Sequence, residues 1–156
     1  MKKKKVLRNS AKAIIIQDGK LLVIQKRDGD ADYCVLPGGG QKKGENLHET
    51  LKREIAEEIG ANIQVGKLLH VREYVSENHG FAQPDREFRQ VEFFFECELV
   101  GDYQPNNGAF PDARQEMVGW VGLENLENVN FYPYCLHPIL NNLKNDQYPV
   151  YLGECN

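Results

Sequence analysis

The sequence predicts an α+β sandwich in which short strands come before and after one central helix, with a second helix late in the chain. Three observations lead to this expectation. Residues 46–60 carry the apolar repeat and both end signals of a helix. Short apolar runs with strand-like alternation lie on both sides of it. The chain has 156 residues, of which 41% are hydrophobic, and this suffices for the core of one domain spanning residues 1–156.

The expected strands are short, rich in aliphatic and aromatic residues, and bounded by turn-forming residues. In chain order they are residues 11–17, 21–27, 33–36, 63–76, 88–100 and 115–123. Asp18-Gly19 predicts a tight hairpin between the first two, and Pro37 stops the third. Polar loops are expected at residues 28–32, 77–87 and 101–113, a short late helix through Leu143, and a mobile or edge segment at residues 1–8.

The central helix has recognisable ends. Asn46 is a suitable N-cap, and Glu49 three residues later completes a capping box. Gly60 predicts the stop, because glycine adopts the left-handed conformation that closes a last turn. An apolar stripe with a spacing of four residues should face the core, and it consists of Leu47, Leu51, Ile55 and Ile59.

The strand at residues 88–100 alternates most clearly. One row, expected to face the core, is Val91, Phe93, Phe95, Cys97 and Leu99. The opposite row is Gln90, Glu92, Phe94, Glu96 and Glu98. Glu92 has two interpretations of equal weight, an ordinary solvent-facing glutamate or an inward-facing acid that adds a metal ligand.

Three carboxylates, those of Glu54, Glu57 and Glu58, crowd one patch of the helix. Like charges at this spacing repel, and Arg53 can neutralise only part of the charge. A solvated acidic face is one explanation. The other is a hard divalent cation such as Mg²⁺, which prefers oxygen ligands.

Composition narrows the class of protein. The net charge of −4 speaks against a stable nucleic-acid complex, and no apolar run approaches the roughly 18 residues of a membrane span. The lysine-rich start lacks the apolar stretch of a signal peptide. The four cysteines show no paired spacing, so we expect neither a zinc site nor a disulfide framework, and a reducing cytoplasm as the setting.

The glycine loop and the helix together resemble a known signature. Gly39 is followed six positions later by Glu45, and then, at fixed spacing, by Arg53-Glu54-Ile55-Ala56-Glu57-Glu58-Ile59-Gly60. This pattern resembles the Nudix box, with Ala61 in place of the usual bulky aliphatic residue as a mild departure. The resemblance covers about a sixth of the chain by strict motif. It implies an α/β/α sandwich with a mixed sheet, in which the box forms a loop–helix–loop.

The resemblance also implies metal ligands. Glu57 and Glu58 would bind Mg²⁺ or Mn²⁺, and Glu54 would be either the general base or a further ligand. The carbonyl of Gly38 would be an inner ligand. Glu92 and Glu116 are the two candidates for a further carboxylate, Glu116 because relatives often carry an acid shortly before a tryptophan such as Trp120.

Other residues are expected to support the site or the substrate. Arg53 would orient Glu54 or Glu57, and Glu45 would support the metal from the loop. The glycines at 39 and 40 would let backbone approach a ligand, next to the partly positive end of the helix. Arg27, Arg72 and Glu73 are candidate substrate contacts; for the neighbouring Lys26 a solvated strand end is the simpler interpretation.

The implied reaction is metal-dependent hydrolysis of a diphosphate bond in a nucleotide. Cations held by the acids can neutralise the diphosphate, bridge its oxygens and lower the pKa of a bound water. The substrate stays open among nucleoside triphosphates, ADP-ribose, nucleotide sugars and dinucleoside polyphosphates. Aromatic side chains that could stack on a base are Tyr74, Phe81, Tyr103 and Phe110.

Two alternatives to a hydrolase are a nucleotide sensor and an isomerase. A Nudix-fold sensor that binds a nucleotide without catalysis would have little use for all three box glutamates. Isoprenoid diphosphate isomerisation would need a reactive cysteine in the site, and the cysteine positions give it no support. The tail at residues 148–156 is expected to form an edge strand or the contact of a homodimer.

Overall fold

The computed structural model describes residues 4–79, 86–143 and 147–156. Its strands are β1 (Lys4–Ile14), β2 (Ile16–Gln17), β3 (Lys20–Asp28), β4 (Ala31–Val35), β5 (Gly38–Gly40), β6 (Ile63–Val75), β7 (Arg86–Leu99), β8 (Gln115–Gly122), β9 (Phe131–Tyr132) and β10 (Tyr151–Glu154). Its α-helices are α1 (Leu47–Ile59) and α2 (His137–Leu140), and 3₁₀ turns cover Ser76–Asn78, Leu123–Val129 and Tyr134–Leu136.

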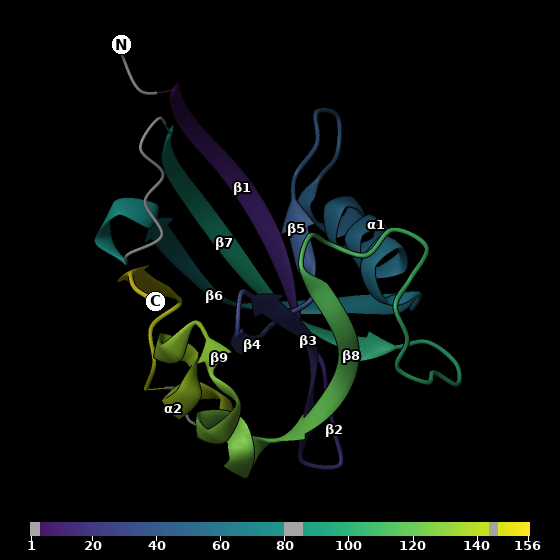
Figure 1. Ribbon diagram of the computed structural model, residues 1–156. Helices are drawn as coiled ribbons and strands as arrows, with labels where there is room; N and C mark the ends of the chain where they lie inside the picture. Colours follow the sequence, from purple (N-terminus) through teal and green to yellow (C-terminus); the bar gives the residue numbers. More distant parts are fainter. Residues whose placement is uncertain (1–3, 80–85, 144–146) are drawn as a thin grey trace.

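Two mixed sheets form the framework of the described residues (Figure 1). The first has the order β10-β6-β7-β1-β5, and β1 runs parallel to β7 while β6 runs antiparallel to it. The second contains β2, β3, β4 and β9, with β8 paired to β3. Strands β4 and β9 are parallel, and β3 and β4 are antiparallel. The expected α+β class with mixed sheets is confirmed.

Two apolar clusters lie on different sides of the first sheet. One joins α1 to alternate residues of β1 and β7, among them Ala11, Ala13 and Phe95. The other joins Ile14 and Phe94, from the opposite face of the same strands, to the region of α2 and the 3₁₀ turns. Figure 1 shows α1 and α2 on opposite sides of the strands, which is the layering of an α/β/α sandwich.

Helix α1 begins and ends as its sequence predicts. The side chain of Asn46 accepts from the Glu49 N–H, and the side chain of Glu49 accepts from the Asn46 N–H, each at 2.9 Å. Gly60 has a left-handed conformation with φ of 64°. Leu51, Ile55 and Ile59 are fully buried, and Leu47 is partly buried beside them. These local signals are therefore confirmed.

Several element boundaries differ from the expectation. Residues 28–32, predicted as a loop, belong to β3 and β4 except for the turn at Gly29-Asp30. Of the two expectations for the N-terminal segment, residues 4–8 fit the edge and not the mobile one, because this first part of β1 pairs with β7, whereas β5 joins β1 only at residues 10–12. The late helix covers only residues 137–140, after a 3₁₀ turn. The tail does form an edge strand, since β10 pairs with β6.

The second row of β7 is exposed only in part, and for Glu92 the inward-facing interpretation is the one that the structure shows. Gln90 and Glu92 are buried, and Phe94 is fully buried, whereas Glu96 and Glu98 are exposed as expected. Glu92 is buried because Arg72 and Gln90 hold its carboxylate, and Phe94 is buried because it packs in the apolar cluster with residues of α2.

The expectation that the cysteines do not pair was also wrong. Cys135 and Cys155 form a disulfide that ties the 3₁₀ turn before α2 to the end of β10. Cys34 and Cys97 remain buried thiols. No helix in the described part of the chain has the length and apolarity to cross a membrane.

Candidate active site

The glycine loop is fitted tightly between β1 and α1. Strand β5 pairs antiparallel with β1, with Gly38 opposite Lys12 and Gly39 opposite Ala11. A Cβ at position 38 would come within 2.1 Å of the Ala11 carbonyl oxygen, and one at position 39 within 2.5 Å of the Glu54 carboxyl carbon. Glycine is therefore required at position 38, where backbone blocks a side chain, whereas a side chain at position 39 would displace the Glu54 carboxylate, against which the backbone of the loop directly lies.

Arg53 connects the loop to the acids of α1. Its guanidinium donates to Glu54 at 2.9 Å, to Glu57 at 3.3 Å and to the Gly40 carbonyl at 3.0 Å, and it makes two further hydrogen bonds to Glu45. The hydrogen bond from Arg53, together with one from the Lys42 backbone, lowers the pKa of Glu45 to about 2. Glu45 and Arg53 thus remain a charged pair, and Arg53 fixes the positions of Glu54 and Glu57.

Glu58 is the buried member of the acidic patch, with 3% of its surface exposed. One carboxylate oxygen accepts from the Gly38 N–H at 3.2 Å. Burial raises the pKa of Glu58 to about 8, and although the charge of Lys12 acts in the opposite direction, the nearby charges of Glu54 and Asp112 add to the increase.

Lys12 and Asp112 are members of this region that the sequence reasoning missed. The Lys12 ammonium donates to the Gly38 carbonyl at 3.3 Å. Asp112, from the loop before β8, accepts from Lys26 at 2.6 Å. Burial alone would raise the pKa of Asp112, but the hydrogen bond and charge of Lys26 hold it below its ordinary value. An aspartate in a turn-rich loop and a lysine within an apolar strand gave no pattern that marked either residue.

The side chains of the box fit a divalent cation in chemistry, although they do not form a finished cage. Among the described residues, no three His, Cys, Asp or Glu side chains are gathered so that they could hold a metal ion. The donors nearby are all oxygens, which Mg²⁺ and Mn²⁺ prefer. The ammonium of Lys12 at the Gly38 carbonyl, next to the Glu58 carboxylate that accepts from the Gly38 N–H, marks a place where positive charge is accommodated.

Glu92 lies in a buried ion pair with Arg72, and the Gln90 side chain donates to its second oxygen at 2.8 Å. Burial by itself would raise the pKa of Glu92, but the charges of Arg72 and Lys12 hold it below its ordinary value. Arg72 also donates to the Cys155 carbonyl at 2.5 Å and lies over the Tyr74 ring. Glu92 is therefore inward-facing, and its direct partner is an arginine.

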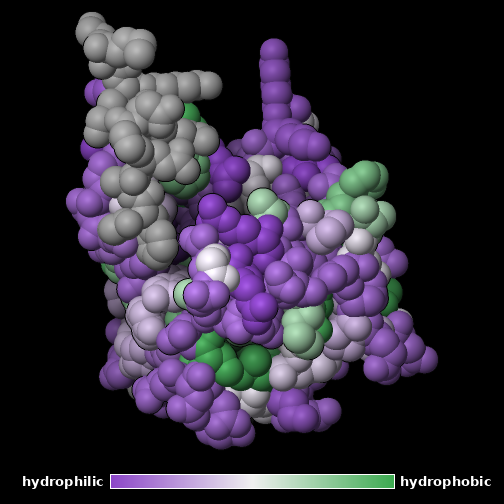
Figure 2. Space-filling model, viewed as in Figure 1, coloured by the Kyte–Doolittle hydropathy of each residue, from purple (hydrophilic) through white to green (hydrophobic). Residues whose placement is uncertain are grey.

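A cavity of about 580 Å³ opens next to these groups. It is lined by Lys26, Asp28, Ala31, Asp32, Tyr33, Arg72, Tyr74, Ser76, Phe88, Arg114, Asn130, Tyr132 and Asn156. Lys26 and Arg72 connect it to the box region, since Lys26 binds Asp112 and Arg72 binds Glu92. Its size lies within the range of small-molecule sites. Figure 2 shows mainly hydrophilic residues across the middle of the face viewed in Figure 1.

Of the proposed stacking residues, Tyr74 lines the cavity. Tyr103 instead donates its hydroxyl to the Ile59 carbonyl at 2.6 Å, and Phe110 is exposed. Phe81 and most of the predicted loop at residues 77–87 lie outside the described residues. Sequence reasoning missed the other aromatic residues that line the cavity, Tyr33, Phe88 and Tyr132.

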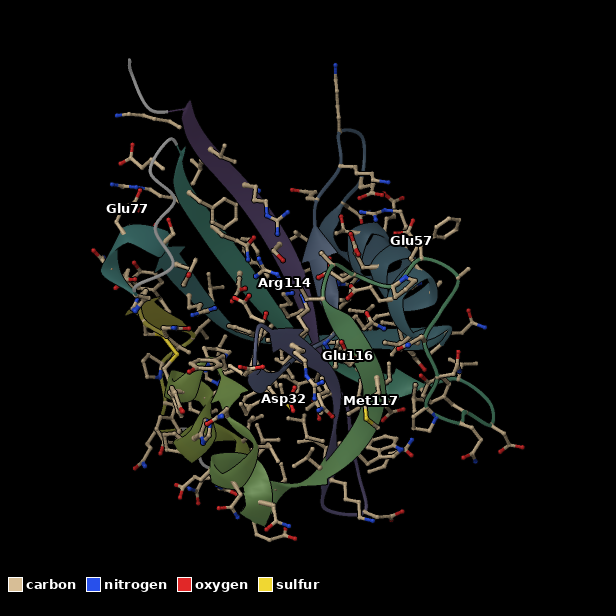
Figure 3. The ribbon with its side chains drawn as sticks, viewed as in Figure 1. Asp32, Glu57, Glu77, Arg114, Glu116 and Met117 are labelled. Carbon is tan, nitrogen blue, oxygen red and sulfur yellow. A yellow bond between two sulfur atoms is a disulfide. The ribbon has the colours of Figure 1, made fainter. Side chains whose placement is uncertain are left out.

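Three predicted site residues are not brought to the box acids. Arg27 pairs with Asp32 at 2.7 Å on the exposed end of β3. Glu73 accepts from the Tyr151 hydroxyl at 2.5 Å, and Glu116 is exposed, with its backbone carbonyl bound by Asn107. Figure 3 shows Glu116 on β8 and Glu57 on α1, apart from each other.

Comparison with known proteins agrees with this geometry. The family profile described as NUDIX domain matches residues 6–138. "Nucleoside diphosphate-linked moiety X motif 6" of Mus musculus is 29% identical over 69% of this chain and 31% of its own length. An "ADP-ribose pyrophosphatase" of Methanocaldococcus jannaschii is 33% identical over 56% of this chain and 48% of its own. The chain thus spans about a third to a half of these curated relatives.

Solved structures share the architecture. A NUDIX hydrolase from Nitrosomonas europaea superposes with a TM-score of 0.70 at 18% identity, covering 89% of each chain, which shows the fold alone. A MutT NUDIX hydrolase from Burkholderia pseudomallei is 28% identical, with a TM-score of 0.59 over 76% of this chain and 85% of its own. Because the family profile covers most of the sequence, including the whole glycine loop and α1, the chain belongs to the NUDIX domain family.

Proposed function

We propose that this protein is a Nudix pyrophosphohydrolase, which hydrolyses the diphosphate bond of a nucleoside diphosphate linked to another group with the help of Mg²⁺ or Mn²⁺. The observation that carries the proposal is the arrangement around Arg53. One guanidinium holds Glu54, Glu57, Glu45 and the loop carbonyl of Gly40 together. A merely solvated acidic face would not need such an organising group.

Some side chains of the box are proposed to bind the metal, and Arg53 is proposed to orient them. Bound at the box, a divalent cation supplies charge neutralisation for the diphosphate oxygens. Gly38, Glu57 and Glu58 are the proposed ligands, and Glu54 is either a further ligand or the general base. Arg53 restricts the orientation of Glu54 and Glu57 before substrate arrives, which lowers the cost of reaching the reactive geometry.

The adjoining cavity is the proposed site for the nucleoside. Tyr33, Tyr74, Phe88 and Tyr132 offer aromatic surface for a base, and Asn130 and Asp32 offer hydrogen-bonding groups. ADP-ribose is one candidate, because the archaeal relative bears the name of an ADP-ribose pyrophosphatase. The substrates of relatives that this chain covers only in part do not fix its own.

The test is a panel of substrates with purified protein. ADP-ribose, nucleoside triphosphates, nucleotide sugars and dinucleoside polyphosphates are incubated with Mg²⁺, with Mn²⁺ and with chelator, and products are separated by chromatography. We expect metal-dependent cleavage into two phosphate-containing products for at least one member. Glu57→Gln should abolish it, and Glu98→Gln, which removes an exposed carboxylate on β7, should not. Equal turnover in both variants would refute the assignment.

The alternative is a nucleotide sensor on the same fold. It predicts tight binding of one panel member with no turnover in any metal. The ion pairs that Arg53 makes with two separate box glutamates favour the enzyme, because binding alone does not require the two carboxylates to be fixed.

A cytoplasmic location and a homodimer are also part of the proposal. Cytoplasmic glutathione keeps most cysteine pairs reduced, so Cys135 and Cys155 would be thiols there. Rapid alkylation of cells followed by mass spectrometry distinguishes thiols from a disulfide, and a persistent disulfide would speak against this location. Sedimentation equilibrium reads the oligomeric state directly.

A further inference from the structure

Lys12 occupies a position that the established features of the fold leave unexplained. It lies in β1 directly opposite Gly38, between Ala11 and Ala13, which are both fully buried in the core beneath α1. Its own side chain is partly buried, on the opposite face of the strand from these alanines, and partial burial of an ammonium costs free energy unless its charge is used. In the described part of the chain, its hydrogen bond goes to the Gly38 carbonyl and not to a carboxylate.

The charge of this ammonium is felt by acids of three separate elements. Its charge acts on Glu58 of α1, on Glu92 of β7 and on Asp112 of the loop before β8, and in each case it lowers the pKa of the carboxyl group. Glu92 and Asp112 already have closer cations in Arg72 and Lys26. Within residues 4–79, 86–143 and 147–156, Glu58 forms no such ion pair, and the Gly38 N–H that donates to it belongs to the residue whose carbonyl binds Lys12.

We propose that Lys12 is a positioning residue that acts as a built-in cation of the box, holding the Gly38 carbonyl and balancing Glu58 until a divalent cation replaces it there. The inference rests on the proposed function, because it takes Gly38 and Glu58 as ligands. It adds that the metal must compete with a charge that the chain itself supplies.

The direction in which metal affinity changes when Lys12 is replaced distinguishes a competing cation from a purely structural residue. Loss of a residue that merely supports the site weakens metal binding. Loss of a competing cation strengthens it, because two like charges no longer contend for the same oxygens. Removal of one positive charge at a few ångströms from a divalent cation should tighten binding by about tenfold or more.

The experiment is a Mn²⁺ titration of chelator-treated protein, followed by the electron paramagnetic resonance of free Mn²⁺. Lys12→Met keeps the length of the side chain and removes its charge, and we expect it to bind Mn²⁺ about tenfold more tightly than the unaltered protein. Lys12→Arg keeps the charge and should bind within about threefold of the unaltered protein. Lys67→Met removes the same charge from an exposed position on β6 and should change nothing.

Equal or weaker Mn²⁺ binding by Lys12→Met overturns the proposal, as does the absence of Mn²⁺ binding in both proteins. If Lys12→Met does not fold, Lys12→Gln gives the same comparison with a shorter polar side chain. The readout contains no turnover, so an inactive wild-type protein would refute the hydrolase while the titration still decides the role of Lys12.

Discussion

Gly39→Ala tests whether the position of the Glu54 carboxylate matters for the reaction. The new Cβ would lie 2.5 Å from the Glu54 carboxyl carbon and 2.7 and 2.8 Å from its two oxygens. Ordinary van der Waals contact begins near 3.4 Å, so the carboxylate must move by about 1 Å. It can do so, because it is the end of a flexible side chain.

The expected result is a large loss of rate with little loss of stability. A displacement of about 1 Å in a catalytic group costs about a hundredfold in rate, or about 2.7 kcal/mol of transition-state stabilisation. The free energy of unfolding should change by no more than about 1 kcal/mol, because the three atoms nearest to the new methyl group belong to a flexible side chain. The assay is kcat on the best substrate of the panel, with urea unfolding of the same preparation.

Gly119→Ala is the matched control, because a Cβ there meets nothing within 4 Å. It should leave kcat unchanged. A second variant, Gly39→Ala combined with Glu54→Asp, shortens the side chain and relieves the overlap, so the two changes should not be additive. If Gly39→Ala keeps kcat within about threefold of the unaltered protein, the contact between loop and carboxylate has no catalytic importance and the reasoning fails.

Three further predictions follow from the same contacts. Glu57→Gln should lose at least about a hundredfold in kcat while circular dichroism and thermal unfolding stay near those of the unaltered protein, and full metal-dependent activity would contradict the proposed ligand role. In metal-free protein the folded-state pKa of Glu58 is about 8, above its ordinary value of 4.5. The protonated Glu58 therefore contributes its full stabilisation below pH 4.5, and this stabilisation is lost as the pH rises to about 8. With chelator present, the urea midpoint of Glu58→Gln should therefore fall less between pH 5 and 8 than that of the unaltered protein. Parallel falls of the two midpoints would show that the pH dependence does not come from Glu58. Asn46→Ala should lower the free energy of unfolding by about 1 kcal/mol through loss of the capping box, with kcat nearly unchanged, and an unaltered urea midpoint would count against the cap.

Helix α1 could be predicted almost residue by residue, because its determinants are local. The capping residues Asn46 and Glu49 lie three positions apart, and Gly60 closes the helix by its own backbone conformation. The box acids share one helix, so their spacing alone brought them together. Arg53 was expected to reach Glu54 or Glu57, and it contacts both because they lie one and four positions away.

Features that join distant segments could not be read from the pattern. The alternation of β7 indicated a solvent-facing side, but the burial of Glu92 depends on Arg72, which lies 20 residues away on β6. Cys135 and Cys155 have no diagnostic spacing, and they meet because β10 returns to pair with β6. Asp112 approaches Lys26 across 86 positions of sequence.

The contrast between the local box motif and segments that the fold brings together also applies to the substrate site. The box lies within residues 38–61, well inside the stretch 6–138 that matches the family, whereas Asn156 lines the cavity from beyond that stretch. Its side chain and the Cys155 carbonyl both accept hydrogen bonds from Arg72, which hold this end of the chain against the cavity. One wall of the cavity is therefore built by a segment that the family pattern does not constrain. The proposed diphosphate chemistry therefore depends on the box, whereas selectivity for the attached group should depend on residues such as Asn156, outside the matched stretch.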